Sequence, residues 1–455
     1  MPYEGEFAQY KPLRRLVESD RVQELLGSYK VRSNSERLQS LETLKQAKIE
    51  PSDWTPKYVI AIDGSHREVE IKNGFPGAEA SYITVASVIL DIDKMRELDR
   101  QRPVDPKQFR EIENAQSIDC ALPGCNVISE GEKSAKASLR KSIFEVFSSF
   151  QAFDEGGESL LDTYEALLQY KPTGLQKQKC PYEDCPDNKD YQRGQGQYAC
   201  GCSLSRTLYS TDALRIHERM SPAGTNSGIF AEIMQVWERV WMIHLLRSLE
   251  AKEWLSSLSR LAIVMDGPLA VFGQPAWISQ AIYQDLSRLN ALVKKATTGK
   301  DILIIGVEKT GTFVQHFEDI DKEEDGSYGA FPSQHIGMLD DSYIKKNVIF
   351  SDSKKPYGDA TYFGRKLFYK TKSGARLVVT LPFLQDEHRD LTKAELSQYP
   401  RISDAVGLLD RLFSSRFPNA LAPLVSANAE AAIPLSLGNQ VLERLAKELI
   451  EEEQK

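Results

Sequence analysis

The sequence predicts an α/β fold: a mixed β-sheet with helices, interrupted by a cysteine-rich insertion. Apolar, β-branched segments begin at residue 58 and return near residues 261, 301 and 376, with segments of helical spacing between them. All six cysteines fall within residues 94–227. At 455 residues the chain is longer than one hydrophobic core usually fills, so we expect a large domain with insertions.

The first 55 residues are predicted to be an N-terminal helical segment. Apolar residues recur every three to four positions in residues 16–28 and again in residues 35–47, which is typical of amphipathic helices. Pro51 follows the second segment, where a helix is expected to have ended. The sheet is therefore predicted to begin after this segment.

The predicted core begins in residues 56–93. Residues 58–63 and 81–93 are rich in β-branched side chains and are separated by the turn-like residues 72–80, which predicts an antiparallel hairpin. Residues 94–227 are mixed and polar and are too long for a loop in a compact domain. We therefore interpret them as an insertion with structure of its own.

Residues 228–455 are predicted to complete the core, since helical and strand patterns alternate along them. The expected elements are a helix at 227–255, a strand at 260–267, a helix at 277–296, strands at 301–311 and 375–383, and a C-terminal helix at 438–453.

The charge balance argues against a general affinity for polyanions. Lys and Arg number 57 and Asp and Glu number 65, which gives a net charge of −8. Any contact with nucleic acid must therefore come from local basic patches. No segment approaches the roughly 20 apolar residues that span a bilayer, and the first residues lack the pattern of a signal peptide. We expect a cytoplasmic protein without a membrane contact, whose cysteines are free thiols or metal ligands.

Two predicted strands run into an Asp-Gly pair, Asp63-Gly64 and Asp266-Gly267. Loops at the ends of strands in α/β folds carry reacting groups. Two carboxylates that meet there repel each other unless a cation or a proton lies between them, and a pair of Mg²⁺ or Mn²⁺ ions is the usual solution in nucleases. A single Asp-Gly pair is more often a simple turn. The repetition on two matched strands favours a shared site.

Four cysteines predict a second, structural metal site. They lie within 23 residues of one another, at Cys180, Cys185, Cys200 and Cys202. Four thiolates bind Zn²⁺ tetrahedrally and can stabilise a small insertion that lacks a core. The spacing departs from the common two-residue knuckle, so scattered reduced thiols are the alternative. Cys120 and Cys125 repeat the first spacing and could replace one pair.

A basic segment, residues 341–380, predicts a track for single-stranded DNA. Its cationic residues alternate with tyrosines and phenylalanines, and basic side chains neutralise phosphates while aromatic rings stack on bases. The alternative is a solvated, strand-rich surface whose aromatic side chains lie in the core. The candidate DNA contacts are Lys345, Lys346, Lys354, Lys355, Arg365 and Lys366.

The sequence resembles the NurA family of nucleases. The resemblance rests on YVIAIDGS at 58–65, a following helix that bears glutamate, LAIVMDGPL at 261–269 and GVEKTG at 306–311. It extends over roughly residues 56–450, with the middle insertion outside it. It implies an RNase H-like fold and a manganese- or magnesium-dependent nuclease that acts on DNA ends and single strands. It also implies a homodimer that docks on a HerA-type hexameric ATPase.

The resemblance also implies roles for individual residues. Asp63 and Asp266 match the two strand aspartates, and a glutamate on the intervening helix is expected to complete the metal site. Glu232 is the first candidate and Glu238 the second, whereas an exposed helix residue is the alternative for either. Lys309 matches a lysine after the third strand and is expected to hold a phosphate. The alternative for Lys309 is a solvated loop residue.

One position departs from the family pattern. Members tend to carry a histidine before the last helix, where this chain has Asn428 and Glu430. Asparagine can bind a hard cation through its carbonyl oxygen, but it cannot exchange a proton near neutral pH. A simple turn cap is the alternative for Asn428. Asn428 is therefore not expected to act as a general acid or base. The prediction of metal-dependent hydrolysis does not depend on it.

The sequence thus predicts a metal-dependent DNA nuclease in which Asp63, Glu232 and Asp266 hold Mn²⁺ or Mg²⁺ while water attacks a phosphodiester in line. Such an enzyme would work with a HerA-like ATPase in DNA end processing or anti-phage defence. A catalytically weak adaptor that binds and regulates a motor ATPase is the alternative, and the missing histidine favours it. Retention of both Asp-Gly strands favours the nuclease.

Overall fold

The computed structural model describes most of the chain as two compact units, residues 1–43 and 44–455. The described residues are 10–29, 34–71, 75–97, 113–152, 157–172, 180–182, 184–185, 192–202, 206–413 and 421–432. The first unit contains the helices α1 (Tyr10–Val17), α2 (Asp20–Gly27) and α3 (Asn34–Thr43). The predicted C-terminal helix, 438–453, lies outside the described residues.

The second unit is built on a nine-stranded sheet with the order β1-β9-β10-β11-β8-β7-β2-β3-β4. The strands are β1 (Lys45–Lys48), β2 (Tyr58–Glu70), β3 (Glu79–Asp91), β4 (Glu113–Pro123), β7 (Leu261–Asp266), β8 (Ile304–Glu308), β9 (His335–Met338), β10 (Gly364–Lys370) and β11 (Arg376–Pro382). A separate two-stranded sheet is formed by β5 (Gln197–Ala199) and β6 (Thr207–Tyr209).

The predicted RNase H-like mixed sheet is confirmed in the central part of the large sheet. Strands β2, β3 and β4 form an antiparallel meander, and β7 and β8 continue the sheet in parallel with β2. The predicted hairpin is the β2–β3 pair, which is in register from Tyr58↔Asp91 to Glu70↔Glu79. Strand β4 lies within the range predicted as an insertion and pairs with β3 along its length. The proposed domain boundaries stay a prediction.

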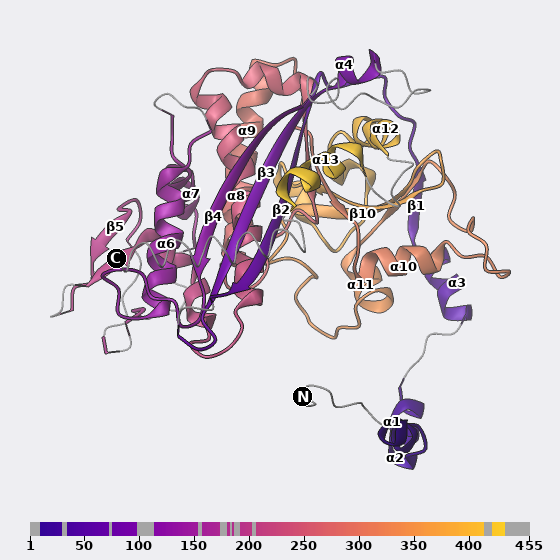
Figure 1. Ribbon diagram of the computed structural model, residues 1–455. Helices are drawn as coiled ribbons and strands as arrows, with labels where there is room; N and C mark the ends of the chain where they lie inside the picture. The colour runs from indigo at the N-terminus through magenta and orange to yellow at the C-terminus, as the bar shows by residue number, and fades with distance from the viewer. Residues whose placement is uncertain are drawn as a thin grey trace. The chain divides into compact units, whose positions relative to one another are not determined.

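Alternation along β2 assigns the two faces of the sheet. Ile60 and Ile62 join a core with the helices on one face, and Val59 and Ala61 join the core on the other face. Figure 1 shows the helices of the first face beside β2, β3 and β4, with α12 and α13 on the opposite side. The first-face helices are α6 (Ala135–Ser149), α7 (Leu160–Leu168), α8 (Ser227–Ala251) and α9 (Trp277–Ala296), and the others are α12 (Ile402–Leu412) and α13 (Ala422–Ala431).

Helix α8 is the central support of the first face. It buries Phe230, Ile233 and Trp237 against the sheet core, and each fully buried side chain of this size contributes about 1.5–3 kcal/mol. This packing fixes the position of the helix along β2 and therefore the height of its polar residues. None of the helices in the described ranges is long and apolar enough to cross a membrane.

Shorter helices connect these layers. They are α4 (Ile92–Glu97), α10 (Thr312–Ile320) and α11 (Asp341–Asn347), with 3₁₀ helices at Ser210–Leu214, Ile216–Arg219, Leu255–Arg260, Gln274–Ala276, Asp386–Arg389 and Leu396–Gln398.

Candidate functional site

Asp63, Asp266 and Lys309 meet at one point of the sheet. Strands β2 and β7 pair in parallel up to Ile62↔Met265, which makes the two aspartates the next residues along neighbouring strands. The Lys309 Nζ lies 2.9 Å from Asp266 Oδ1 and 3.5 Å from Asp63 Oδ2. Lys309 directly follows β8, the neighbour of β7, so three adjacent strands supply the three side chains.

Asp63 does not end its strand, which differs from the sequence prediction. Strand β2 continues to Glu70 because its antiparallel partner β3 continues beside it. The parallel pairing with β7 stops one residue before Asp63, whereas Asp266 is the last residue of β7. The site therefore lies where the two parallel strands stop pairing.

Glu238 on α8 is the third carboxylate at this point. It is 5% exposed, and a Cβ built on Gly64 would lie 2.5 Å from Glu238 Oε1. The glycine after Asp63 thus lets the helix carboxylate reach the strand. Burial raises the pKa of Glu238 to about 8, the Asp63 and Asp266 charges contribute to the rise, and Arg239 opposes it.

Arg239 connects Glu238 to the strand end at Asp266. Its Nη1 lies 2.6 Å from Glu238 Oε2, and its Nη2 donates to the carbonyl oxygens of Asp266 and Pro268, each at 3.1 Å. The guanidinium is buried together with Glu238. Arg239 is not among the residues predicted from the sequence, although the charged pair Glu238-Arg239 in an otherwise apolar helical stretch was an available signal.

Glu232, the first candidate for the helix carboxylate, has other partners. Its Oε1 accepts the Gln274 backbone N–H at 2.7 Å, and its Oε2 lies 3.2 Å from Arg219 Nη1. It also lies against Gly273, where a Cβ would be 1.5 Å from Oε1. Glu238 is six positions after Glu232 on the helix, which is about 9 Å along the axis. The structure therefore brings Glu238 to the aspartates and uses Glu232 to anchor the loop before α9.

The carboxylate cluster has the chemistry of a divalent-cation site. Asp63 Oδ2 and Asp266 Oδ1 are buried and accept no hydrogen bond of regular geometry from the described residues, and their contact there is the ion pair with Lys309. Burial and the Asp266 charge raise the pKa of Asp63 to about 6 against the effect of Lys309. Carboxylate oxygens are the ligands that Mg²⁺ and Mn²⁺ prefer, so these residues fit such an ion.

Asn428 lies apart from this cluster in the described contacts. It is exposed on α13, a helix that packs on the face of β2 that carries Val59 and Ala61, and its backbone carbonyl accepts the Ala432 N–H at 2.8 Å. This bond belongs to the helix end. Helix geometry therefore accounts for the observed bond of Asn428.

Three residues of the predicted DNA track have their charged groups bound within the protein in the structure. Arg365 is 1% exposed and donates to the carbonyl oxygen of Lys393 at 2.6 Å. Lys366 is buried and lies 2.7 Å from Glu308 Oε1 and 3.4 Å from the centroid of the Phe313 ring. Both belong to β10, which is flanked by strands on both sides and buried along its length. They support the fold from inside.

Lys345 is the third residue that departs from the track. Its ammonium donates to Asp341 Oδ2 at 2.8 Å and to the backbone carbonyls of Ser353 and Lys355 at 2.7 and 2.6 Å. These bonds hold the loop after α11. The exposed members of the prediction are Lys346, Lys354 and Lys355, and this loop also carries Phe350, which is 93% exposed.

The cysteines of the β5–β6 region form a compact thiol cluster. Cys200 Sγ lies 3.7 Å from Cys180 Sγ and 3.6 Å from Cys185 Sγ, and all three atoms lie within 4.8 Å of one another. Burial raises the pKa of Cys200 to about 12, and the Cys202, Cys185 and Cys180 thiols contribute to the rise. A Zn–S distance of about 2.3 Å corresponds to a tetrahedral S···S edge of about 3.8 Å. The cluster is compatible with a zinc site.

Cys120 and Cys125 do not join that cluster in the described structure. Cys120 Sγ contacts the Ile83 carbonyl at 3.8 Å, and Cys125 Sγ donates to the Gly77 carbonyl at 2.9 Å. Both are free thiols.

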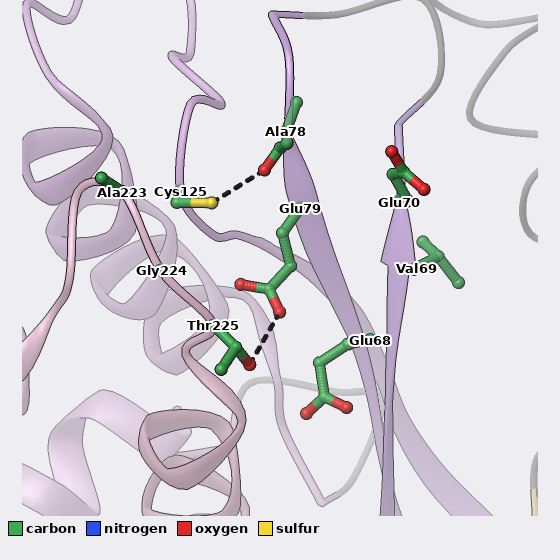
Figure 2. A pocket seen from close by; sticks show the side chains of 10 residues that line it. Glu68, Val69, Glu70, Ala78, Glu79, Cys125, Ala223, Gly224 and Thr225 are labelled. Carbon is green, nitrogen blue, oxygen red and sulfur yellow. Dashed lines mark hydrogen bonds between the residues drawn. The ribbon is translucent and has the colours of Figure 1, made fainter. Parts of the chain in front are cut away.

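Cys125 lines a cavity of about 340 Å³ at the far end of the β2–β3 hairpin. Figure 2 shows Glu68, Glu70 and Glu79 around it. Glu79 Oε2 accepts the Asn226 backbone N–H at 3.1 Å, directly before α8. Glu79, a residue that lines the cavity, thus helps to fix the start of α8, the helix that bears Glu238.

One family model matches most of the chain. The family model described as the NurA domain matches residues 57–421 of this chain. Among solved structures, the NurA nuclease from Sulfolobus solfataricus is 9% identical, with a TM-score of 0.39 over 98% of each chain. A NurA structure with manganese is 10% identical, with a TM-score of 0.24 over 96% of this chain and 98% of that chain. No curated protein matches the chain.

The family model covers well over half of the chain and includes every residue of the carboxylate cluster. The assignment rests on that match. The chain belongs to the NurA family.

Proposed function

We propose that this protein is a metal-dependent deoxyribonuclease that hydrolyses phosphodiester bonds of DNA ends and single strands. The observation that carries the proposal is the convergence of Asp63, Asp266 and Glu238 at the point where β2 and β7 stop pairing. Two of these carboxylates have buried oxygens whose described partner is a lysine ammonium. Family membership supports the same activity.

Asp63, Asp266 and Glu238 are the residues that would hold Mn²⁺ or Mg²⁺. When bound, such an ion polarises the phosphate and activates water for in-line attack. Glu238 is favoured over Glu232 because its charge interacts with both aspartates, whereas Glu232 is bonded to Arg219 and Gln274. Asn428 is left out of the metal site because its described bond, from the Ala432 N–H to its backbone carbonyl, belongs to the end of α13.

The chain's own cations would orient the reacting groups. Arg239 holds the Glu238 carboxylate and the backbone after Asp266 in one arrangement, so the two ligands move little relative to each other. Lys309 lies beside both aspartates with a side chain that is 30% exposed, and it would bind a phosphate oxygen as a point charge. Burial raises the pKa of Glu238, and the ion pair with Arg239 opposes that rise.

For the cysteine cluster we propose a structural Zn²⁺ held by Cys180, Cys185, Cys200 and Cys202. The sulfur distances around Cys200 support a tetrahedral site. The region has little core of its own: β5 and β6 are three residues each. An ion would hold this ribbon against α6 and α7.

DNA, a HerA-like hexameric ATPase and a second copy of the chain are the proposed partners, and the cytoplasm is the proposed location. The family resemblance supports these partners, and exposed Lys346, Lys354 and Lys355 support a DNA contact. DNA end processing and anti-phage defence are the two roles compatible with a motor-coupled nuclease.

The deciding experiment is cleavage of end-labelled single- and double-stranded DNA with Mn²⁺, Mg²⁺ or EDTA. Asp63→Asn and Glu238→Gln are expected to lose at least about a hundredfold in rate, because a missing ligand also removes the charge that holds the ion. Glu232→Gln is the matched control on the same helix and is expected to retain metal-dependent cleavage. Equal losses in the two glutamine variants would contradict the assignment of Glu238.

The proposed nuclease activity would be rejected if the wild-type protein cleaved no DNA under any condition, including in the presence of a HerA-like ATPase. That result would favour the adaptor, the alternative suggested by asparagine at position 428.

A further inference from the structure

Lys309 lies where an ion shared by the two strand aspartates would lie. Its ammonium is 2.9 Å from Asp266 Oδ1 and 3.5 Å from Asp63 Oδ2, and both of these oxygens are buried. Asp63 is buried, whereas the Asp266 side chain is 31% exposed although its Oδ1 is buried. Two carboxylates that share one partner at this range require a positive charge or a proton between them. In this arrangement the ammonium supplies that charge.

The ammonium and a divalent ion exclude each other from this position. Bonds from Mg²⁺ to carboxylate oxygens are about 2.0–2.1 Å, shorter than both lysine contacts. An ion that binds the same two oxygens would therefore draw them inward and place a double positive charge beside the ammonium. Like charges at this distance repel strongly where the surroundings are buried.

The Lys309 side chain is free to turn from the aspartates toward solvent. It stands in the loop after β8, outside regular structure, and its side chain is 30% exposed. Arg239 is different, because it is 2% exposed and is fixed by Glu238 and two backbone carbonyls. Of the two cations in the cluster, Lys309 is the one able to leave without unfolding the site.

We infer that Lys309 is a built-in placeholder for the catalytic ion: it neutralises Asp63 and Asp266 before metal binds and turns outward when metal enters. The inference rests on the proposed nuclease site and adds a regulation to it. The outward ammonium is then free to bind a phosphate of the DNA. The placeholder stabilises the metal-free fold and weakens metal binding, since metal must displace it.

The first test is the affinity of the purified full chain for Mn²⁺ alone, measured by calorimetry without DNA. Lys309→Met is expected to bind Mn²⁺ about tenfold more tightly than wild type, as follows if the ammonium occupies the site about nine-tenths of the time. The metal-free variant is also expected to melt at a lower temperature and to gain more from Mn²⁺.

Lys370→Met is the matched control. Lys370 is also a buried lysine of this sheet, 2.6 Å from Asp321 Oδ1, and Arg376 remains to neutralise that aspartate. This variant is expected to lose stability without a change in Mn²⁺ affinity.

The second test follows Lys309 in the wild-type protein, so it does not depend on a variant that folds. An amine-acylating reagent is applied with and without Mn²⁺, and labelling is measured by mass spectrometry relative to exposed Lys354. Labelling of Lys309 is expected to rise severalfold on Mn²⁺ binding. A general electrostatic effect of the lysine would change affinity but would leave its labelling constant.

The outcomes separate the two proposals. If neither wild type nor Lys309→Met binds Mn²⁺, the metal site and the proposed function are rejected. If both bind with equal affinity, or if labelling of Lys309 does not rise, the placeholder is rejected while the site stands.

Discussion

Gly64 and Glu238 are in contact across the interface between β2 and α8: a Cβ at position 64 would lie 2.5 Å from Glu238 Oε1 and 2.9 Å from Met234 Cγ. A side chain at this position would push the helix carboxylate away from Asp63. The glycine after Asp63 is thus required for the approach of a third carboxylate.

Gly64→Ala is expected to lower the free energy of unfolding by about 1–3 kcal/mol, the usual result of overpacking a filled interface. It is also expected to weaken Mn²⁺ binding, because Glu238 must move. Urea denaturation and calorimetry measure the two effects. Gly228→Ala is the control. Gly228 is on α8, the helix of Glu238, and a Cβ added there would have no atom within 4 Å, so the substitution should be neutral or stabilising.

Arg239→Met is expected to cost roughly 3–5 kcal/mol in unfolding free energy, because it leaves the buried Glu238 without its partner. The double variant Glu238→Gln with Arg239→Met should recover part of that loss. Urea denaturation of the four proteins in a double-mutant cycle gives the coupling energy. Additive losses would show that the pair does not act as a unit.

His244 is expected to make the stability of the protein depend on pH. Its Nε2 accepts the Ala152 N–H at 3.1 Å, so Nδ1 carries the proton and donates to Thr163 Oγ1 at 2.8 Å. Burial lowers the pKa of His244 to about 4, below its value of 6.5 in the unfolded chain. The unfolded state therefore binds more protons between these two values, and stability falls as pH falls through this window.

The contribution of His244 over that window is roughly 3 kcal/mol, at 1.36 kcal/mol for each pH unit. Urea denaturation between pH 7 and pH 4 should give a shallower loss for His244→Gln than for wild type. His217, whose pKa burial also lowers to about 4, should still contribute. Identical slopes in wild type and variant would contradict the buried neutral state of His244.

Removal of metal from the cysteine cluster is expected to loosen the β5–β6 ribbon. Cys200→Ser should abolish bound zinc, measured by elemental analysis, and lower the melting temperature to that of the chelator-treated wild type. Cys120→Ser is the matched control, since its thiol contacts only the Ile83 carbonyl among the contacts given by the structure. It should retain zinc, and loss of zinc in both variants would contradict the assignment.

The exposed lysines of the basic segment are expected to contact DNA, whereas the buried ones are not. Replacing Lys354 and Lys355 by Glu should weaken single-strand binding and reduce the salt slope of the binding constant by about 0.7 for each phosphate that the variant no longer neutralises. Phe350→Ala should cost about 1–3 kcal/mol if its ring stacks on a base. Fluorescence anisotropy over a range of salt concentrations tests both, and an unchanged slope would exclude these lysines.

The local patterns in the sequence were sufficient for the core of the fold and for two of its site residues. Short apolar runs identify both strands, and Asp63 and Asp266 stand out because each is a charged residue directly after such a run. Sequence could not show that β2 continues to Glu70, since the extension depends on pairing with β3.

Local sequence was enough to predict which strands carry the aspartates, that a lysine follows the third strand and that the cysteines gather in one segment. Tertiary structure decided between Glu232 and Glu238. The two side chains leave α8 about 120° apart, so the rotation and translation of the helix on the sheet select which one meets Asp63. Arg365 and Lys366 are buried because β10 lies between two other strands. Their burial could not be predicted from the sequence, since a charged residue in a central strand has the same local pattern as one on the surface. Periodicity is a property of a few neighbouring residues, whereas the partner of a buried charge is set by packing between elements distant in the chain.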